Sequence, residues 1–534
     1  MGRFVNPDNS LFQEAVNSEI YVDKSGLISY TNKVLCTTQK FICNSRPRRF
    51  GKSMTADMLT AYYSRGADSR ELFSSLQISS SPDFETFLNK YDVIHLDVQS
   101  FLELAGKPEK VVSLIKKEII GELREFYPEC VSKDEESLLN ALAKINIKTG
   151  NKFVVIIDEW DVLIRDDANN QKVQDEYISF LRGLFKGPEQ SRYIALAYLT
   201  GILPIKKEKT QSALNNFNEH TMINPGPMAE YFGFTEEEVK ALAEKYHVDF
   251  EETKRWYDGY ILKGNHIYNP KAVVSVMLNG EFISYWSDTA NSDLVIPLIN
   301  MNYEGLKSDT IEMISGGEVP VIVQTFKNDT ISISSKDNVL TYLIHLGYLG
   351  YNQNNKTAFI PNEEIRQEMG YAVESNPWQE MISFMKESGS ILEATLTKDC
   401  DKVAQGIEKI HDEYASNLKY NDENSLSNVL TLAYLASMNR YFKPIRELPT
   451  GKGFADFVYI PKPEFKEDYP ALVVELKWNK DAKTALDQIK EKNYPDSIKD
   501  YTDNILLVGI NYDKTTKQHE CLIENFDGLM LESC

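Results

Sequence analysis

The stretch that decides the fold is Arg46-Pro47-Arg48-Arg49-Phe50-Gly51-Lys52-Ser53. It follows a short apolar run at residues 40–43 and precedes residues 54–59, whose sequence predicts a helix. A strand, a tight loop ending in Gly-Lys-Ser and a helix together form a phosphate-binding loop. In such a loop backbone N–H groups hold the phosphates, the Lys neutralises them and the Ser hydroxyl ligates Mg²⁺. Gly51, Lys52 and Ser53 are therefore expected to bind a nucleotide, with Ser53 as a metal ligand.

The loop departs from the usual pattern at one position. The pattern G-x-x-x-x-G-K-[ST] requires Gly at position 46, where this chain has Arg. Arg46 is then expected to need a backbone geometry that glycine adopts freely. Arg48 and Arg49 are expected to add positive charge near the phosphates.

A second motif lies about 100 residues downstream. Residues 153–157 are five consecutive apolar residues, which predicts a central parallel strand buried on both faces, and Asp158 and Glu159 follow directly. Ligands bind at the carboxyl ends of such strands. Asp158 is expected to hold Mg²⁺, and Glu159 to polarise the water that attacks the γ-phosphate. Acids also follow buried strands simply because the chain reaches solvent, but the Gly-Lys-Ser loop favours the functional interpretation.

A third apolar strand is predicted at residues 193–199, and Thr200 stands at its tip. A polar residue at this point commonly senses the γ-phosphate in ATPases with an acidic neighbouring strand. The alternative is a plain strand terminus. Thr200 is therefore a candidate nucleotide-binding residue.

Composition narrows the classes of protein. With 534 residues the chain is too long for one core, and its formal net charge of −21 argues against a protein that coats nucleic acid non-specifically. No apolar run approaches the roughly 18 residues of a membrane span, and the N-terminus lacks signal-peptide order. The six cysteines are scattered and form no C-x-x-C pair. A cytoplasmic protein without a membrane partner is expected.

The middle of the chain offers structural rather than chemical signals. Thr235 followed by Glu238 predicts a capping box at the start of a helix. The aromatic residues at 256–260 are more typical of a small core than of a stacking platform for bases. A helix at 338–347 and a hairpin at 348–361 predict a winged-helix-like module.

The last part of the chain combines acids with a lysine. A helix is predicted from Glu423, and two strands at 456–460 and 471–477 are predicted to form a hairpin. The hairpin would bring Asp456 close to Glu475. Glu475 and Lys477 share one face because they are two apart. Two carboxylates and an ammonium can form a hydrolytic Mg²⁺ site, whereas the alternative is an amphipathic strand whose Glu and Lys face solvent.

The N-terminal motifs resemble those of the AAA-ATPase-like family of uncharacterised bacterial proteins, a family similar to archaeal-type and STAND P-loop ATPases. The resemblance rests on the loop at 46–53 and on further motifs at 21–25, 157–161, 200–201 and 214–216, and it continues through 256–260, 268–270 and 285–286. That family commonly carries Arg-Pro-Arg-Arg-Phe-Gly-Lys-Ser, so the missing glycine is a family feature. The resemblance implies ATP and Mg²⁺ as cofactors.

The C-terminal constellation resembles the PD-(D/E)xK nuclease superfamily over residues 415–515. By that match Asp456 and Glu475 are ligands of Mg²⁺ or Mn²⁺, and Lys477 is catalytic. Glu423 is a further acid and Gln488, in the following helix, a supporting polar residue. Residues 401–534 nevertheless hold 17 Lys and Arg against 23 Asp and Glu, an acidic balance that is unusual for a domain gripping DNA.

The expected fold is α/β in three parts. An AAA-ATPase-like P-loop domain of the ASCE type with a parallel sheet is placed at 1–235. A helical lid with the winged-helix-like module is placed at 236–390, and a PD-(D/E)xK domain with a restriction-endonuclease-like fold at 391–534.

The expected function is an ATP-binding and ATP-hydrolysing protein that controls a metal-dependent nuclease, in mobile-element biology or in defence against foreign DNA. One alternative is a non-enzymatic NTP-gated switch, or a nucleic-acid-binding protein with an inactive nuclease fold. Another is an ATPase with an inert C-terminal fold. The choice between DNA and RNA, and a homo-oligomeric state, are left open.

Overall fold

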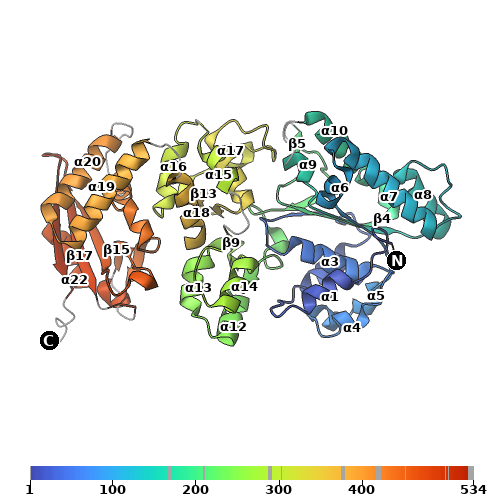
Figure 1. The fold of residues 1–534 in the computed structure, drawn as a ribbon, viewed down its shortest axis with the longest axis horizontal. Helices are drawn as coiled ribbons and strands as arrows, with labels where there is room; N and C mark the ends of the chain where they lie inside the picture. Colours follow the sequence, from blue (N-terminus) through green and yellow to red (C-terminus); the bar gives the residue numbers. More distant parts are fainter. Residues whose placement is uncertain are drawn as a thin grey trace. The chain divides into compact units, whose positions relative to one another are not determined.

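The computed structural model describes the chain in two compact units. The described residues are all except 1, 166–169, 209–210, 287–291, 302, 375–378, 416–422, 451–452, 493, 499–500, 503 and 527–534. The N-terminal unit consists of residues 1–282 and 321–356, and the C-terminal unit of residues 283–320 and 357–534. Each unit contains one five-stranded sheet (Figure 1).

A parallel sheet forms the centre of the N-terminal unit, as predicted. All its neighbouring strands pair in parallel. The strand order is β2 (Asp92–Asp97), β3 (Phe153–Asp158), β4 (Ile194–Gly201), β1 (Phe41–Ser45) and β7 (Asn218–His220). Strands β1, β3 and β4 are buried along their whole length, because helices cover both faces of the sheet.

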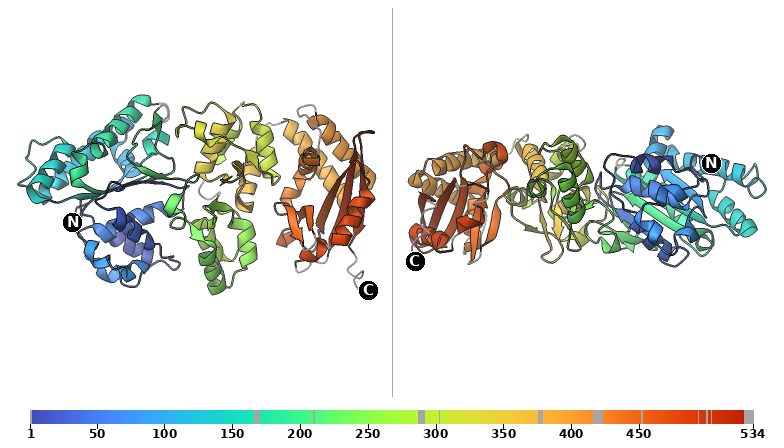
Figure 2. Two further views of the ribbon diagram at one scale, coloured as in Figure 1. Left: turned by 180° about the vertical axis from the view of Figure 1, so that it is seen from behind. Right: turned by 90° about the horizontal axis from the view of Figure 1, so that it is seen from below.

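The two faces of this sheet carry different helices, which Figures 1 and 2 show on opposite sides of the strands. One core packs against α6 (Val98–Ala105), α7 (Val111–Phe126), α8 (Leu138–Thr149), α9 (Val162–Arg165) and α10 (Gln171–Phe185). The other core packs against α1 (Ser10–Val16), α2 (Gly26–Val34), α3 (Lys52–Tyr63), α4 (Arg70–Phe73) and α5 (Phe84–Phe87).

The phosphate-binding loop has the expected layout of strand, loop and helix. It joins β1 to α3, and Gly51 caps α3 in the left-handed region with φ 85°. The expected strain at Arg46 is wrong, because the left-handed residues of the loop are Arg49, with φ 69°, and Gly51. The position that departs from the glycine pattern is therefore not the position where the backbone needs glycine.

A small subdomain follows within the N-terminal unit. Its three-stranded sheet has the order β8 (Phe234–Thr235), β10 (Asn265–Tyr268) and β9 (Tyr260–Leu262), and its helices are α12 (Glu236–Tyr246), α13 (Phe250–Tyr257) and α14 (Pro270–Asn279). The predicted capping box at Thr235 is confirmed by both of its hydrogen bonds. Trp256, Tyr257 and Tyr260 are buried, as expected for a core.

The predicted helix and hairpin of the winged-helix-like module form as α17 (Lys336–Leu346), β12 (Gly350–Asn352) and β13 (Thr357–Phe359). Helix α17 and strand β12 belong to the N-terminal unit, whereas β13 belongs to the C-terminal unit. The middle of the chain is thus shared between the units, and the module and the domain boundaries at 235 and 390 stay predictions.

The C-terminal unit is built on a mixed sheet. The strand order is β14 (Ile445–Thr450), β15 (Gly453–Tyr459), β16 (Ala471–Trp478), β17 (Ile505–Asp513) and β18 (Gln518–Asn525). The pair β16–β17 is parallel and the other pairs are antiparallel. One face packs on α19 (Gln379–Leu396), α20 (Cys400–Ala415) and α21 (Glu423–Ala433), and α22 (Ala482–Lys492) contacts β16 and β17.

Further elements of this unit are α15 (Ser292–Ile299), α16 (Leu306–Ile314), β11 (Val319–Pro320) and α18 (Glu363–Glu374). Together the two units confirm the α/β class, with a helical middle and a C-terminal mixed sheet. In the described part of the chain, no helix is both long and apolar enough to span a bilayer.

Candidate nucleotide and nuclease sites

The register of the N-terminal sheet brings the predicted nucleotide residues to one edge. Ser45 of β1 pairs with Gly201 of β4, so the loop after β1 begins beside the tip that carries Thr200. Strand β3 pairs with β4 on its other side, which places Asp158 next in line. The carboxyl ends of parallel strands are where open α/β sheets bind ligands.

Lys52 is held in position inside the loop. Its side chain is buried, and Nζ donates to the carbonyl oxygen of Pro47 at 3.0 Å. Nζ also lies 3.9 Å from Oε1 of Glu159. Burial lowers the pKa of Lys52, and the carboxylates of Glu159 and Asp158 oppose this effect. An ammonium held by a backbone carbonyl at a helix N-terminus is well placed to neutralise a phosphate.

Asp158 is a buried acid beside the hydroxyl of Ser53. Burial raises the pKa of Asp158 to about 6, and a hydrogen bond from the Ser53 side chain opposes the rise. The backbone N–H of Glu159 also donates to Oδ1 of Asp158, at 2.9 Å. The two residues predicted as Mg²⁺ ligands are therefore brought together, and a cation would favour the ionised form that burial disfavours.

Glu159 is clamped by an arginine that sequence reasoning missed. Nη1 of Arg165 lies 3.3 Å from Oε2 of Glu159 and 3.3 Å from Oδ2 of Asp161. Asp161 is fully buried and accepts hydrogen bonds from the backbone N–H groups of Ile202 and Leu203. Asp161 thus fixes the chain just after the tip of β4. The i,i+4 spacing of Asp161 and Arg165 is the signal that could have revealed the pair.

Thr200 is buried beside other polar groups whose hydrogen-bonding capacity is unused. Thr200 pairs in register with Asn44 of β1, which in turn pairs with His220 of β7. Within the described residues, Oγ1 of Thr200 and both amide atoms of Asn44 are buried without a hydrogen-bond partner. Buried polar atoms normally have hydrogen-bond partners, so Thr200 and Asn44 have donors and acceptors available for a ligand or for water.

Arg46 is a structural anchor of the loop. It is fully buried, and its guanidinium donates to the carbonyl oxygens of Ser45, His220 and Met228 at 2.8, 3.1 and 3.3 Å. The guanidinium carbon also lies 5.4 Å from the centre of the Phe232 ring. Burial lowers the pKa of Arg46 to about 10, which leaves the side chain charged at neutral pH. Arg48 and Arg49, in contrast, are exposed.

Replacing Arg46 by alanine should therefore make the folded chain less stable. The change leaves three buried carbonyl groups without their donor and should cost about 3 kcal/mol of the free energy of unfolding. Urea unfolding of the two proteins measures the difference. Arg48→Ala, at an exposed position two residues away, is the matched control and should change stability by less than about 0.5 kcal/mol. Equal stability of both variants would contradict the anchoring role.

A mostly apolar pocket of about 390 Å³ opens beside the loop. Gly51 lines it together with Met54, Thr55 and Met58 of the helix α3 that follows, and further walls come from residues 20–22, 231, 233 and 234. The charged residues that line it are Lys24, Arg49 and Lys271. Pockets of this size and polarity bind small organic ligands. No single sequence motif predicted it, because its walls come from segments far apart in the chain.

The predicted hairpin in the C-terminal unit is confirmed. Strands β15 and β16 are antiparallel, and Phe457 pairs with Val474. Asp456 precedes the first of these residues and Glu475 follows the second, so the register places the two acids side by side. Oδ2 of Asp456 accepts a hydrogen bond from the backbone N–H of Leu476 at 2.7 Å.

Glu475 is a buried acid with one oxygen engaged and one free. Nζ of Lys477 donates to Oε1 of Glu475 at 2.8 Å and to the carbonyl oxygen of Leu476 at 2.9 Å. Oε2 of Glu475 is buried and has no hydrogen-bond partner within the described residues. Burial, followed by the charge of Asp456, raises the pKa of Glu475 to about 7. The pair is not the solvent-exposed cross-pair of the alternative interpretation, because Glu475 and Lys477 are both buried.

The two supporting residues differ in what the structure says of them. Nε2 of Gln488, in α22, donates to Oε1 of Glu475 and lies 3.2 Å from the hydroxyl of Tyr494. Glu423 is the first residue of α21, but its side chain lies outside the described part of the chain.

Both sites have the donor chemistry that Mg²⁺ requires. In the first, the Ser53 hydroxyl and the Asp158 carboxylate are neighbours. In the second, burial and then the charge of Asp456 raise the Glu475 pKa, and Oε2 of Glu475 has no hydrogen-bond partner among the described residues. Mg²⁺ prefers oxygen ligands and commonly uses one or two carboxylates. The residues present therefore fit the metal at both places.

Two family models match separate parts of the chain, one containing Lys52 and Asp158 and the other containing Asp456 and Glu475. Residues 11–210 match the family model described as predicted AAA-ATPase, and residues 421–521 match the model of the PD-(D/E)XK nuclease superfamily. An uncharacterised protein from the vnfD 5′ region of Azotobacter chroococcum mcd 1 is 23% identical over 527 residues, which is 93% of either chain. The solved structure of the Aeropyrum pernix ORC2 protein in ADPNP and ADP complexes is 12% identical. It has a TM-score of 0.28 and covers 69% of this chain and 98% of its own. The chain joins an AAA-ATPase-like domain, at residues 11–210, to a domain of the PD-(D/E)XK nuclease superfamily, at residues 421–521.

Proposed function

We propose that the chain binds and hydrolyses ATP and thereby controls a metal-dependent phosphodiesterase site of its own, which cuts DNA or RNA. The observation that carries the proposal is Oε2 of Glu475, which is buried beside Asp456 and Lys477 and has no hydrogen-bond partner in the part of the chain that the structure describes. A carboxylate that is buried and incompletely bonded costs stability, so its presence at this position favours a ligand-binding role over a structural one. The role in mobile-element biology or in defence, a cytoplasmic location and a homo-oligomer remain predictions.

In the nucleotide site, each residue has a separate task. Lys52 and the N–H groups at the start of α3 would hold the β- and γ-phosphates. Ser53 and Asp158 would hold Mg²⁺, which neutralises phosphate charge when bound. Glu159, kept beside Lys52 and Arg165, would orient the attacking water. Thr200 would contact the γ-phosphate with its hydroxyl, which has no hydrogen-bond partner within the described residues.

The apolar pocket at the start of α3 fits the base of the nucleotide. Its lining by Met54, Met58 and Phe234 provides apolar contact for a flat ring, and it adjoins Gly51 of the loop. The exposed Arg49, which also lines the pocket, would lie between the base and the phosphates. The base and phosphate sites are thus continuous through the loop itself.

In the nuclease site, Asp456 and Glu475 would hold the metal, which supplies an activated water and charge neutralisation when bound. Lys477 would stabilise the charge that develops on the phosphate, and Gln488 would orient Glu475. Lys477 already contacts Glu475, so the lysine and the acid act as one unit.

Cleavage should rise with pH through the neutral range. Glu475, whose pKa is raised to about 7 in the metal-free chain, keeps its proton at lower pH. A cation must displace that proton, so metal affinity increases as the pH approaches 7 and levels off above it. At low Mg²⁺ the cleavage rate should follow this curve, and higher Mg²⁺ should move its midpoint to lower pH. Rates between pH 5.5 and 9 at two Mg²⁺ concentrations measure it, and a midpoint independent of Mg²⁺ would contradict the assignment.

The proposed activity is tested with three substrates in parallel: supercoiled DNA, linear DNA and single-stranded RNA, each with Mg²⁺ or Mn²⁺. We expect the chain to cleave at least one of the three substrates, and we expect this cleavage to stop when the metal is chelated. Absence of cleavage from all three, with ATP and without it, would overturn the nuclease half of the proposal.

A second function is favoured by one observation. Residues 401–534 have more acidic than basic residues, which opposes the binding of a polyanion. The chain would then be an NTP-gated switch that binds nucleotide and a partner without cutting. This alternative predicts ATP binding that Lys52→Ala abolishes, together with no metal-dependent cleavage.

A further inference from the structure

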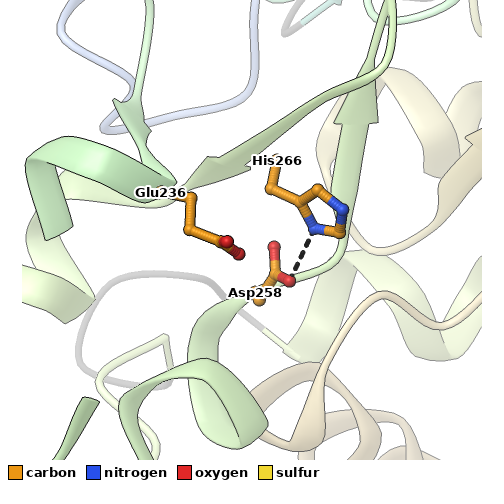
Figure 3. A group of neighbouring side chains, drawn as sticks. All are labelled: Glu236, Asp258 and His266. Atoms are coloured by element: carbon orange, nitrogen blue, oxygen red, sulfur yellow. Dashed lines mark hydrogen bonds and ion pairs between the residues drawn. The ribbon is translucent and has the colours of Figure 1, made fainter. Parts of the chain in front are cut away.

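A third group of metal-ligating side chains lies away from both proposed sites, in the small subdomain of the N-terminal unit. Figure 3 shows Glu236, Asp258 and His266 facing one another. Glu236 is the first residue of α12, Asp258 follows the end of α13, and His266 lies in β10. One ligand atom of each residue lies within 4.8 Å of those of the other two. We propose that these three residues bind a divalent transition-metal ion such as Zn²⁺.

The spacing is wider than one shared ion requires, but within reach of a side-chain movement. Ligands about 2.0–2.2 Å from a tetrahedrally coordinated zinc ion are about 3.3–3.6 Å apart. The ligand atoms here lie within 4.8 Å of one another, so binding requires the ligand set to contract by roughly 1 Å. A change of side-chain rotamer at the partly exposed Glu236 provides that movement. The ligands come from three separate elements, so the bound ion would link α12, α13 and β10.

The ligand types indicate which class of ion is bound. Imidazole nitrogen suits Zn²⁺ and related transition ions, whereas Mg²⁺ prefers oxygen ligands alone. Two carboxylates and one imidazole also neutralise a dication, and three protein ligands leave a coordination position for water. The proposed site therefore differs in chemistry from the two Mg²⁺ sites, neither of which includes a histidine.

Neighbouring groups hold the ligands in orientation. The backbone N–H of Gly259 donates to Oδ1 of Asp258 at 2.6 Å, and Nδ1 of His266 lies 2.7 Å from Oδ2. Gly259 has φ 130°, a conformation that favours glycine. The hydroxyl of Tyr268 lies 3.5 Å from Oε2 of Glu236. Gly259 and Tyr268 lie outside the ligand set, and such outer partners are typical of metal ligands, since they fix the ligand atom that faces the ion. The contact between His266 and Asp258 joins two of the ligands, so the ion has to replace it.

Lys254 is the competitor of the ion. Its Nζ lies 2.7 Å from Oε2 of Glu236, so the ammonium supplies positive charge in the metal-free chain. Both side chains are about one third exposed, 37% for Lys254 and 35% for Glu236, and an exposed pair of this kind is weak. A metal ion that also gains Asp258 and His266 should displace the lysine.

The alternative is that Glu236–Lys254 and Asp258–His266 are two independent ion pairs. Titration of the full-length, chelator-stripped chain with Co²⁺ separates the two accounts, with millimolar Mg²⁺ present to occupy the other sites. The visible absorption of bound Co²⁺ and equilibrium dialysis report the affinity and the number of ions. We expect one Co²⁺ per chain, displaced by Zn²⁺.

The variants give the test its specificity. His266→Gln and Asp258→Asn should each weaken Co²⁺ binding by at least about tenfold, whereas Lys254→Met should strengthen it by removing the competitor. His247→Asn is the matched control, because His247 is an exposed histidine at the end of the same α12 and asparagine tolerates its left-handed backbone. Circular dichroism and ATP binding check that each variant is folded.

Two results would overturn the proposal: no Co²⁺ bound in the presence of Mg²⁺, or an affinity that His266→Gln leaves unchanged. A Lys254→Met variant that binds no more tightly would contradict the assignment of Glu236. None of these readouts depends on nuclease or ATPase activity, so the metal site and the proposed function can fail separately.

Discussion

Replacing Lys52 by alanine should reduce ATP hydrolysis by at least about 100-fold and weaken ATP binding strongly. The side chain is buried at the start of α3, and its ammonium is fixed by the Pro47 carbonyl and faces Glu159. Removing a positioned cation from a site where water is excluded takes away charge stabilisation that solvent does not replace. Release of phosphate and displacement of a fluorescent ATP analogue measure the two effects.

Lys40→Met is the matched control for this variant. Lys40 is also buried, and its Nζ also donates to backbone carbonyl oxygens, those of Ser191 and Ile194. It precedes β1 and so stands at the opposite end of that strand from the phosphate-binding loop. Its loss should lower stability but leave ATP affinity unchanged. If Lys52→Ala hydrolysed ATP at the rate of the unaltered chain, the nucleotide site would have to lie elsewhere.

Replacing Glu475 by glutamine should lower the rate of metal-dependent cleavage by about 100-fold or more. The rate of ATP hydrolysis should stay unchanged. Glutamine keeps the shape of the side chain but removes the charge that holds the cation. It also removes a negative charge that is unfavourable in this place, because burial and then the charge of Asp456 raise the pKa of Glu475. The variant should therefore fold at least as stably as the unaltered metal-free chain above pH 7, where ionised Glu475 costs stability.

Glu464→Gln provides the control for Glu475→Gln. Glu464 lies in the segment that joins β15 to β16 and is exposed. Its replacement changes the net charge of the unit by the same amount but touches neither Asp456 nor Lys477. Cleavage that survives in Glu475→Gln would move the metal site away from this hairpin.

Short local motifs made much of the fold and several site residues predictable. Gly51-Lys52-Ser53 lies where strand changes to helix, and the run before Asp158 is apolar without interruption, so both patterns identify a buried parallel strand and its carboxyl end. In the last part of the chain, the interval between Asp456 and Glu475 contains prolines that mark the turn of a hairpin. In each case the signal and its consequence lie within one short stretch of the chain.

The features that sequence reasoning missed depend on contacts between distant segments. Arg46 binds carbonyl groups 174 and 182 residues downstream, at His220 and Met228, which no local pattern reveals. The expectation of strain at Arg46 failed for the same reason, since the loop places its left-handed residues elsewhere. The pocket beside α3 and the ligand set at Glu236, Asp258 and His266 also assemble only when separate elements fold together.

The division of the middle of the chain between the two units is a further feature that the sequence did not predict. Helix α17 and strands β12 and β13 were predictable one by one from their hydrophobic patterns. Their distribution between the two compact units was not, because residues 283–320 leave the N-terminal unit and the chain returns to it at residue 321. Continuity in sequence is a poor guide to packing when a unit is built from two segments.

The central claim is that nucleotide at Lys52 controls cleavage at Glu475. It is tested most directly by the rate of nicking of supercoiled plasmid in Mg²⁺ or Mn²⁺, with and without ATP, for the unaltered chain, Lys52→Ala and Glu475→Ala. A coupling of ordinary strength changes a rate by roughly 5- to 150-fold. The account predicts that ATP changes the nicking rate of the unaltered chain within that range. It predicts no effect of ATP on Lys52→Ala, and no nicking by Glu475→Ala. Nicking at one rate with and without ATP, or nicking that survives Glu475→Ala, would contradict it.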